Sequence, residues 1–190
     1  MSNAVSALQG ARFEGFATIT ESGLRGMITL RGDLASSAVK SAVKAATGLA
    51  VPTQRQFATA DEHGVGWMSP DELLLMVPYE KAPEITARLA AALEGEHALV
   101  VNVSDARAVF SIEGQSAREV LAKLSPVDVS QESFPEGTLR RTRLAQTAVA
   151  FWAKGKNAFE LICFRSEAGY VFDVLSMSAR KGSEVNFYST

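Results

Sequence analysis

With 190 residues, 47% of them hydrophobic, the chain can bury a core of its own and needs no disulfide or metal to hold it. A formal net charge of −2 argues against a nucleic-acid-binding protein, and no apolar run approaches the roughly 18 residues of a membrane span. Cys163 is the single cysteine, and the first five residues lack the features of a secretory signal, so we expect a soluble, cytoplasmic protein.

An arm, a strand and a helix are predicted at the start of the chain. Residues 1–11 are small and polar, as in a loose terminal arm, and residues 13–20 suit an edge strand. Apolar and polar residues alternate over residues 24–30, which predicts a strand with one wet face. Asp33 is placed to cap the helix that follows, and Gly48 is placed to end it.

Two strands joined by a tight turn, and then a second helix, are predicted next. Trp67 lies just before a turn at residues 69–72, which contains Pro and Asp. Residues 73–77 are apolar on both faces, which is typical of a central strand. Ile85 and Leu89 then recur at helical spacing, which predicts the second helix.

The second half of the chain has the same order of elements. Residues 106–113 alternate between apolar and polar, as in a half-buried strand. Ser116 and Glu119 have the spacing of a capping box at the start of the next helix. Strand-like runs at residues 142–152 and 158–165, with a hairpin loop between them, precede a final helix.

Individual residues of the two halves also correspond. Gly32 and Gly114 each follow the first strand of their half, where each is expected to form a strand-to-helix turn. Trp67 in the first half matches Trp152 in the second, because each precedes the last strand. A correspondence of this length indicates an internal repeat.

The repeat predicts an α+β fold built from two pseudo-symmetric βαββα repeats. Neither repeat alone could cover its apolar face, so the two are expected to pack as a pair. No change in composition separates them. We therefore expect a single domain over residues 1–190, with repeats at about residues 24–95 and 106–181.

Motifs for catalysis or metal binding are weak. His63 and His97 are far apart and have no cysteine nearby, which disfavours a metal site. Cys163 lies between apolar residues of a strand, which favours an inert buried thiol. Residues 64–66 hold two glycines but precede a strand and not a helix, so they do not make a dinucleotide fingerprint, and no histidine accompanies the turn at residues 104–105 to form a triad.

Two polar features allow more than one interpretation. Arg141 and Arg143 share one face of a predicted strand, where they could bind an anion or an acidic partner, or could form a solvated edge. Residues 114–116 open a helix whose free backbone N–H groups could hold a carboxylate or phosphate, although helix capping alone explains them.

Seven stretches together resemble one protein family. They are GWMSPDELLL (66–75), SDAR (104–107), IEGQSA (112–117), LSPVD (124–128), FPEG (134–137), RTRLAQ (141–146) and RSEAGY (165–170). This ensemble resembles the gamma subunit of heterotetrameric sarcosine oxidase, and the resemblance spans nearly the whole chain. That family in turn resembles the folate-binding domain of the glycine-cleavage aminomethyltransferases.

The resemblance implies a cytoplasmic complex that oxidatively demethylates sarcosine to glycine and passes the one-carbon unit to tetrahydrofolate. The partners would be the alpha, beta and delta subunits. FAD, FMN, NAD and folate would belong to the alpha and beta subunits and zinc to the delta subunit, with no cofactor in this chain.

The residues themselves also favour a non-catalytic subunit. Asp105 and Glu113 are candidates for a pterin-binding carboxylate by location, but each also suits a turn or a strand end. No flavin or nicotinamide fingerprint is visible, and amine demethylation requires a cofactor. The alternatives are a free-standing folate-binding protein of the aminomethyltransferase type and a regulatory or assembly module.

The chain ends in an aromatic tail. Val185, Phe187 and Tyr188 follow the last helix and have little periodic partner of their own. The tail either packs onto the core of this chain or contacts a partner subunit, and aromatic residues are enriched in interface cores. Phe187 and Tyr188, with Arg141 and Arg143, are therefore the candidate partner-contact residues.

Overall fold

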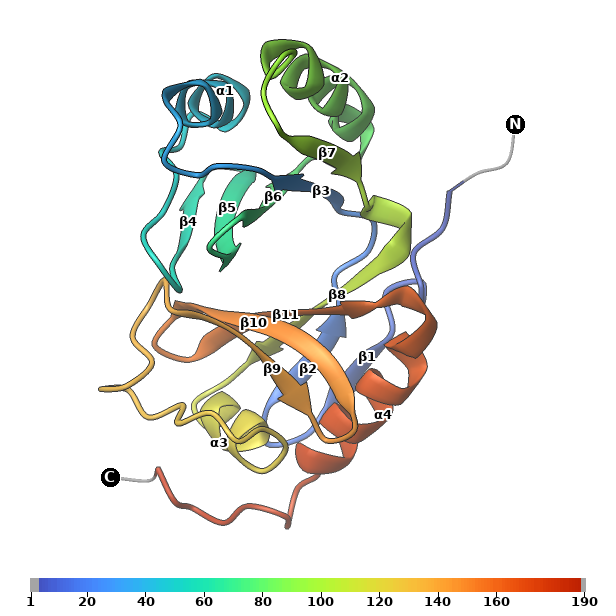
Figure 1. Ribbon diagram of the computed structural model, residues 1–190. Helices are drawn as coiled ribbons and strands as arrows, with labels where there is room; N and C mark the ends of the chain where they lie inside the picture. The colour runs from blue at the N-terminus through green and yellow to red at the C-terminus, as the bar shows by residue number, and fades with distance from the viewer. Residues whose placement is uncertain (1–3, 189–190) are drawn as a thin grey trace. The chain divides into compact units, whose positions relative to one another are not determined.

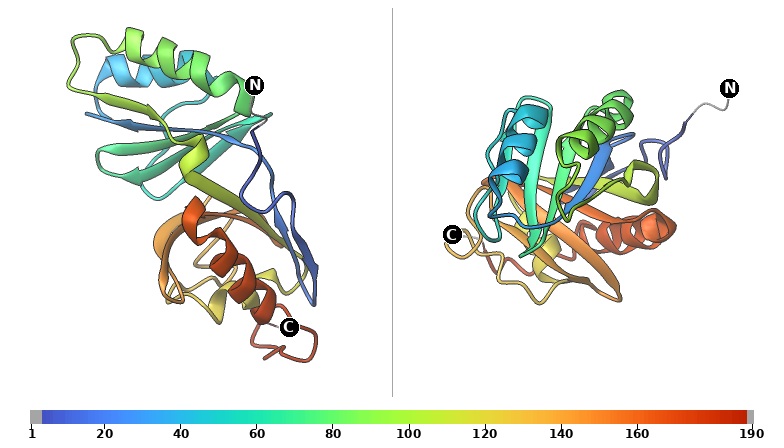
Figure 2. Two further views of the ribbon diagram at one scale, coloured as in Figure 1. Left: turned by 90° about the vertical axis from the view of Figure 1, so that its right-hand side faces the viewer. Right: turned by 45° about the horizontal axis from the view of Figure 1, so that its top comes forward.

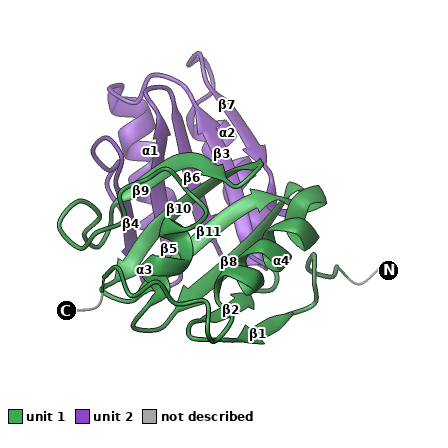
Figure 3. Ribbon diagram, turned by 90° about the horizontal axis from the view of Figure 1, so that it is seen from below, with its two compact units in different colours: residues 1–24, 105–190 green, residues 25–104 purple. Residues whose placement is uncertain are grey.

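The computed structural model describes residues 4–188, which fold as two compact units (Figure 1). Unit 2 comprises residues 25–104, whereas unit 1 combines the residues up to 24 with those from 105 onward (Figure 3). Each unit has one antiparallel sheet and two α-helices that pack on the same face of it. The mixed fold that the sequence predicts is thus confirmed.

Unit 2 is a five-stranded sheet in the order β4-β5-β6-β3-β7. Its elements are β3 (Gly26–Arg31), α1 (Ser37–Thr47), β4 (Phe57–Ala60), β5 (His63–Ser69), β6 (Glu72–Val77), η1 (Tyr79–Lys81), α2 (Ala82–Ala92) and β7 (Leu99–Asn102). The short helix η2 (Ser104–Ala106) spans the boundary with unit 1. Helices α1 and α2 lie side by side over this sheet (Figure 2). They bury Val39, Val43, Ile85 and Leu89 against Leu30 and its neighbours on the sheet.

Unit 1 is a six-stranded sheet in the order β1-β2-β8-β11-β10-β9. Its elements are β1 (Arg12–Glu14), β2 (Thr18–Glu21), β8 (Arg107–Glu113), α3 (Ala117–Ala122), β9 (Leu139–Leu144), β10 (Thr147–Gly155), β11 (Ala158–Phe164), η3 (Arg165–Glu167) and α4 (Ala168–Ser178). Helices α3 and α4 pack on the sheet through Val120, Leu121, Val171 and Leu175, which are fully buried with Phe110.

The two units have the same strand order. The run β4-β5-β6-β3 in unit 2 corresponds to β9-β10-β11-β8 in unit 1. The backbone N–H of Gly32 donates to the carbonyl of Asp71 at 2.9 Å, and that of Gly114 donates to the carbonyl of Asn157 at 3.0 Å. The two glycines therefore occupy equivalent positions at the end of the first strand, as the sequence predicts.

The fifth strand of each sheet comes from an unexpected part of the chain. Strand β2 precedes the first repeat but pairs with β8 of the second, whereas β7 precedes the second repeat but pairs with β3 of the first. The strand that precedes each repeat in the chain thus belongs to the sheet of the other repeat. This exchange covers an edge that β3 and β8 would otherwise expose.

Each repeat contains one strand more than predicted, because β4 and β9 precede the expected pair. The expected single strand over residues 142–152 is wrong: the chain turns between β9 and β10 at Ala145, which has a φ of 49°. Residues 13–20 likewise divide between two strands, β1 and β2. Neither turn carries the Pro or Asn-Gly signal by which hairpins are recognised in a sequence.

The match of Trp67 with Trp152 is wrong by one residue. Trp67 pairs with Leu73, and the equivalent pair in unit 1 is Ala153 with Phe159. Because side chains alternate between the two faces of a strand, a shift of one residue places the two tryptophans on opposite faces. Trp67 packs at the edge of the unit 2 core, whereas Trp152 lies on the face of its sheet that is turned away from α3 and α4.

Helix α1 is capped differently from the prediction. The Ser36 hydroxyl accepts from the N–H of Ala38 at 3.2 Å and is the N-cap, whereas the Asp33 carboxylate accepts from the N–H of Ala35 and closes a turn before the helix. A serine three residues further on therefore replaces the expected cap. Gly48 ends the helix as expected, with its N–H bonded to the carbonyl of Lys44.

Candidate functional site

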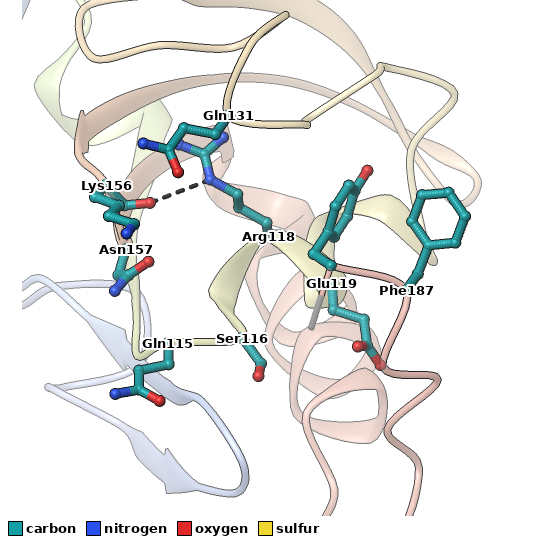
Figure 4. Close-up of a pocket in the computed structure, with 9 residues that line it drawn as sticks. Gln115, Ser116, Arg118, Glu119, Gln131, Lys156, Asn157 and Phe187 are labelled. Carbon is teal, nitrogen blue, oxygen red and sulfur yellow. Dashed lines mark hydrogen bonds between the residues drawn. The ribbon is translucent and has the colours of Figure 1, made fainter. Parts of the chain in front are cut away.

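A pocket of about 750 Å³ lies in unit 1 where β8 ends and α3 begins (Figure 4). It is lined by Gln115, Ser116, Arg118, Glu119, Gln131, Lys156, Asn157, Phe187 and Tyr188. These residues come from the β8–α3 turn, α3 itself, the β10–β11 turn, the long loop after α3 and the tail after α4. Gln115 and Ser116, two of the residues 114–116 that the sequence marked as a possible anion site, thus border this pocket.

Arg118 organises one wall of the pocket. Its side chain is only 6% exposed, and its guanidinium lies 5.1 Å from the Phe159 ring. Nε donates to the carbonyl of Lys156 at 3.1 Å, and Nη1 donates to three carbonyls of the long loop, those of Val129 at 2.7 Å, Ser130 at 3.2 Å and Phe134 at 3.0 Å. These bonds hold a loop without helices or strands against the β10–β11 turn.

No side-chain carboxylate of the described residues balances the charge of Arg118. Within residues 4–188, no Asp or Glu lies at ion-pair distance from its guanidinium, and all its acceptors are backbone carbonyls. Burial lowers the pKa of Arg118, and the nearby Tyr188 side chain opposes that shift. An arginine nevertheless stays charged at neutral pH, so the pocket contains a buried cation.

Glu119 holds the tail instead of capping α3. The predicted capping box is wrong, because the Ser116 side chain makes no cap bond and the Glu119 carboxylate accepts from the backbone N–H groups of Val185 and Asn186, the latter at 2.9 Å. Glu119 is buried. Its partners lie more than sixty residues along the chain, and they fix the tail beside the first turn of α3.

The tail has one inward and one outward aromatic residue. Tyr188 is partly buried and packs against the unit 1 core, whereas Phe187 is 78% exposed. Their rings meet edge to face with centroids 5.0 Å apart. The tail is therefore tied to its own unit while Phe187 stays exposed, and partner contact by this residue stays a prediction.

Arg141 and Arg143 lie on β9, which is an edge strand of the unit 1 sheet. Both are exposed, and Arg143 donates to the carbonyl of Gln146 at 2.9 Å. They belong to a different element from Phe187 and Tyr188, so the four candidate partner-contact residues form two separate pairs. Contact with a partner stays a prediction for this pair too.

Unit 2 has a smaller pocket at the equivalent corner, of about 530 Å³. Here the cation is Arg31, whose guanidinium lies 3.4 Å from the Asp71 carboxylate and 3.8 Å from that of Glu72. Arg31 is largely exposed. The corner of unit 2 therefore contains a solvated ion pair, whereas that of unit 1 contains a buried guanidinium that has no carboxylate partner in the part of the chain that the structure describes.

The remaining sequence candidates lie elsewhere. Burial raises the pKa of Cys163 to about 12, so its thiol is protonated at neutral pH. His63 begins β5, and His97 borders the unit 2 pocket. Asp105 lies in η2 and Glu113 ends β8, both exposed. Over the described residues no group of three or more His, Cys, Asp or Glu is arranged to hold a metal ion.

The glycines of residues 64–66 have a packing role. Both lie inside β5, where a Cβ on Gly64 would come within 2.6 Å of the Phe57 ring. A larger residue would displace that ring from the sheet. Within the described part of the chain, no helix is both long enough and apolar enough to cross a membrane.

Sequence reasoning missed Arg118 and the role of Glu119. A signal was present, since Arg118 and Glu119 interrupt an apolar stripe that contains Ala117, Val120 and Leu121. On a short helix that packs on a sheet, polar residues so close to the stripe are drawn inside and need partners. Their partners come from a loop and a tail with no periodic pattern, which local reasoning could not supply.

Comparison with known proteins gives the family. A sequence model described as the sarcosine oxidase, gamma subunit family matches residues 31–180. The sarcosine oxidase gamma subunit of an Arthrobacter species is 31% identical over 66% of this chain and 62% of that protein. The gamma subunit of Corynebacterium sp. strain U-96 is 32% identical over 64% of this chain and 60% of that protein. The aligned region thus spans about three fifths of these relatives.

Solved structures agree with this result. A chain of the heterotetrameric sarcosine oxidase from Corynebacterium sp. U-96 superposes with a TM-score of 0.80 and 27% identity, over 88% of this chain and 87% of that one. Aminomethyltransferase T of the glycine cleavage system from Bartonella henselae shares the fold, with a TM-score of 0.59, 17% identity and coverage of 83% of this chain and 44% of that one. The match over residues 31–180 shows that the chain belongs to the sarcosine oxidase gamma subunit family.

Proposed function

We propose that this protein is the non-catalytic gamma subunit of a cytoplasmic heterotetrameric sarcosine oxidase. The observation that carries the proposal is the likeness of the whole fold to a chain of such a complex, over nearly nine tenths of both chains. The family match covers both units and not one of them. A shared short motif could not produce a likeness of this extent.

The complex would demethylate sarcosine to glycine and transfer the one-carbon unit to tetrahydrofolate. In this proposal FAD, FMN, NAD and folate sites belong to the alpha and beta subunits and zinc belongs to the delta subunit. The side chains of this chain support a structural role. The Arg118 guanidinium stays protonated, and the thiol of Cys163 is buried and protonated, so neither can attack a substrate as a nucleophile.

Coexpression with the other three subunits tests the proposal. We expect a tagged form of this chain to copurify with them in a complex that oxidises sarcosine, whereas the chain alone should be colourless and consume no oxygen with sarcosine. Sarcosine turnover by the isolated chain, or an active complex formed by the other subunits alone, would contradict the proposal.

A free-standing folate-binding protein of the aminomethyltransferase type is the second candidate. The fold shared with aminomethyltransferase T favours it, although that likeness shows the fold alone. Titration of the isolated chain with tetrahydrofolate separates the two candidates. Stoichiometric binding without any partner favours the second, and binding only in the assembled complex favours the gamma subunit.

The tail and β9 are the proposed partner-contact surfaces. Phe187→Ala should weaken copurification while leaving the melting temperature of the isolated chain nearly unchanged, because the ring is 78% exposed. Tyr170, an exposed aromatic residue on α4, provides the matched control as Tyr170→Ala. Unchanged assembly in Phe187→Ala, together with a lower melting temperature, would show that the tail serves the fold.

The arginines of β9 are tested by reversing their charge. The double variant Arg141→Glu, Arg143→Glu should weaken assembly more at low salt than at high salt if an acidic surface meets this edge. Equal assembly at both salt concentrations would remove these two residues from the interface.

A further inference from the structure

We propose that the unit 1 pocket is a carboxylate-binding site, in which the Arg118 guanidinium and the Tyr188 hydroxyl hold the ligand. The proposal concerns the chain itself and does not depend on its assignment as a subunit. It rests on unused hydrogen-bond donors, on an unbalanced buried charge and on the space in front of them.

The first observation is an unused nitrogen on a buried arginine. A guanidinium has five N–H donors, of which Nη2 carries two. Nε and Nη1 bond to four carbonyls, whereas Nη2 has no acceptor among residues 4–188. The residue is more than nine tenths buried and borders the pocket, and Figure 4 shows its guanidinium directed toward Gln131, away from α3. A ligand in the pocket could therefore accept from Nη2.

The second observation is that no carboxylate of the described residues is paired with this charge. A buried charge is costly unless it is paired, and carbonyl dipoles balance it only in part. The comparison with unit 2 is informative, since Arg31 at the equivalent corner has Asp71 and Glu72 within ion-pair distance. A bound carboxylate would supply to Arg118 both the negative charge and the acceptor, in the charge-assisted geometry that arginine favours.

The third observation is the Tyr188 hydroxyl. It borders the same pocket and has no hydrogen-bond partner among the described residues. Arg118 lines the same pocket and interacts electrostatically with Tyr188. Burial and the Asp128 carboxylate raise the pKa of Tyr188, so the hydroxyl keeps its proton and can donate it to an acceptor.

The surroundings select for a singly charged ligand. Glu119 borders the pocket and the Asp128 carboxylate acts electrostatically on Tyr188, so a doubly charged phosphate would be repelled more than a carboxylate. Gln115, Gln131 and Asn157 offer amide groups to the rest of the ligand. A pocket of about 750 Å³ has room for a small carboxylic acid or for an acidic side chain of a partner protein.

Nuclear magnetic resonance of the arginine side chains tests the site directly. Acetate is added to the isolated full-length chain, and the Nε–H resonance of Arg118 is followed with that of Arg88, an exposed arginine of unit 2, as the control. We expect a saturable shift for Arg118 and none for Arg88. Phosphate at the same ionic strength should bind more weakly than acetate.

Two variants keep the test decisive if Arg118 cannot be replaced without unfolding. Tyr188→Phe should fold and should weaken acetate binding about three- to tenfold, the loss that corresponds to one hydrogen bond. Tyr170→Phe removes the hydroxyl of an exposed tyrosine on α4 that does not line the pocket, and it should keep the Arg118 response. The absence of an Arg118 shift with acetate in the wild-type chain, or equal binding in Tyr188→Phe, would overturn the proposal.

The same titration on the assembled complex distinguishes the two sources of the carboxylate. If the ligand is a free acid, acetate shifts the Arg118 resonance in the complex as it does in the isolated chain. If a partner side chain fills the site, the resonance is already displaced in the complex and acetate has no further effect. An Arg118 resonance that is undisplaced in the complex and insensitive to acetate contradicts both forms of the proposal.

Discussion

The two units share a strand order but differ at the corner where the first strand meets the first helix. In unit 2 that corner leads into α1, an eleven-residue helix with its own serine cap, and its arginine is paired in solvent. In unit 1 the helix α3 has six residues, and a long loop and the tail complete the corner.

The comparison shows how side chains can replace secondary structure. Arg118 fixes the loop through its carbonyls, and Glu119 fixes the tail through its N–H groups. Two adjacent buried residues of opposite charge thus satisfy the backbone groups of two segments that have no helix or strand of their own. The pocket of unit 1 therefore contains a buried cation, whereas the pocket of unit 2 does not.

The largest effect is expected for Arg118→Ala. This change leaves four carbonyls without their donor, so we expect a loss of about 3 kcal/mol or more in the free energy of unfolding. Arg88→Ala in unit 2 is the control, with a change within about 0.5 kcal/mol, because Arg88 is exposed. Chemical denaturation measures the free energy of unfolding of both variants. Equal losses would contradict the claim that the buried Arg118 stabilises its unit more than the exposed Arg88 does.

The equivalent glycines should differ in their tolerance of a side chain. Gly114 has a φ of 130°, which L residues rarely adopt, so Gly114→Ala should cost about 1 to 3 kcal/mol. Gly32 has an ordinary φ, and a Cβ there would lie 3.3 Å from the Cβ of Ala98, so Gly32→Ala should stay within about 1 kcal/mol of the wild type. A reversed order in thermal or chemical denaturation would show that the glycines are not conformationally distinct.

Glu119→Ala should release the tail. Loss of the carboxylate removes the acceptor of two backbone N–H groups, and we expect a cost of about 1 to 2 kcal/mol and faster amide exchange at Val185 and Asn186. Ser37→Ala, in the exposed first turn of α1, is the control. Unchanged exchange at both tail amides would mean that other contacts hold the tail.

The smallest effect concerns pH. The raised pKa of Cys163 means that the unfolded chain loses the thiol proton near pH 9 while the folded chain keeps it to about pH 12. Stability should therefore fall as the pH rises through this window, by at most about 1.4 kcal/mol per pH unit. The residue of unit 2 at the position equivalent to Cys163 is Val77, which has no ionisable side chain. Cys163→Ala should remove this part of the dependence of stability on pH between pH 8 and 10. An identical dependence in the variant would show that the Cys163 thiol does not contribute to it.

Local features were predictable from the sequence and distant partners were not. Gly32 and Gly114 follow an alternating strand, and that signal lies within a few neighbouring residues. The exchange of β2 and β7, by contrast, joins strands far apart in the chain and leaves no local pattern. Glu119 had the right spacing for a cap, but two N–H groups from the tail occupy its carboxylate. Where a polar side chain is buried, its partner is set by the tertiary fold.

Native mass spectrometry of the coexpressed complex tests the central claim most directly. A tagged form of this chain would be purified after coexpression with the three other proposed subunits, and the mass of the intact assembly measured. The gamma-subunit assignment predicts one assembly that contains this chain and all three partners. Recovery of the tagged chain alone, while the other subunits form a complete oxidase without it, would contradict the assignment.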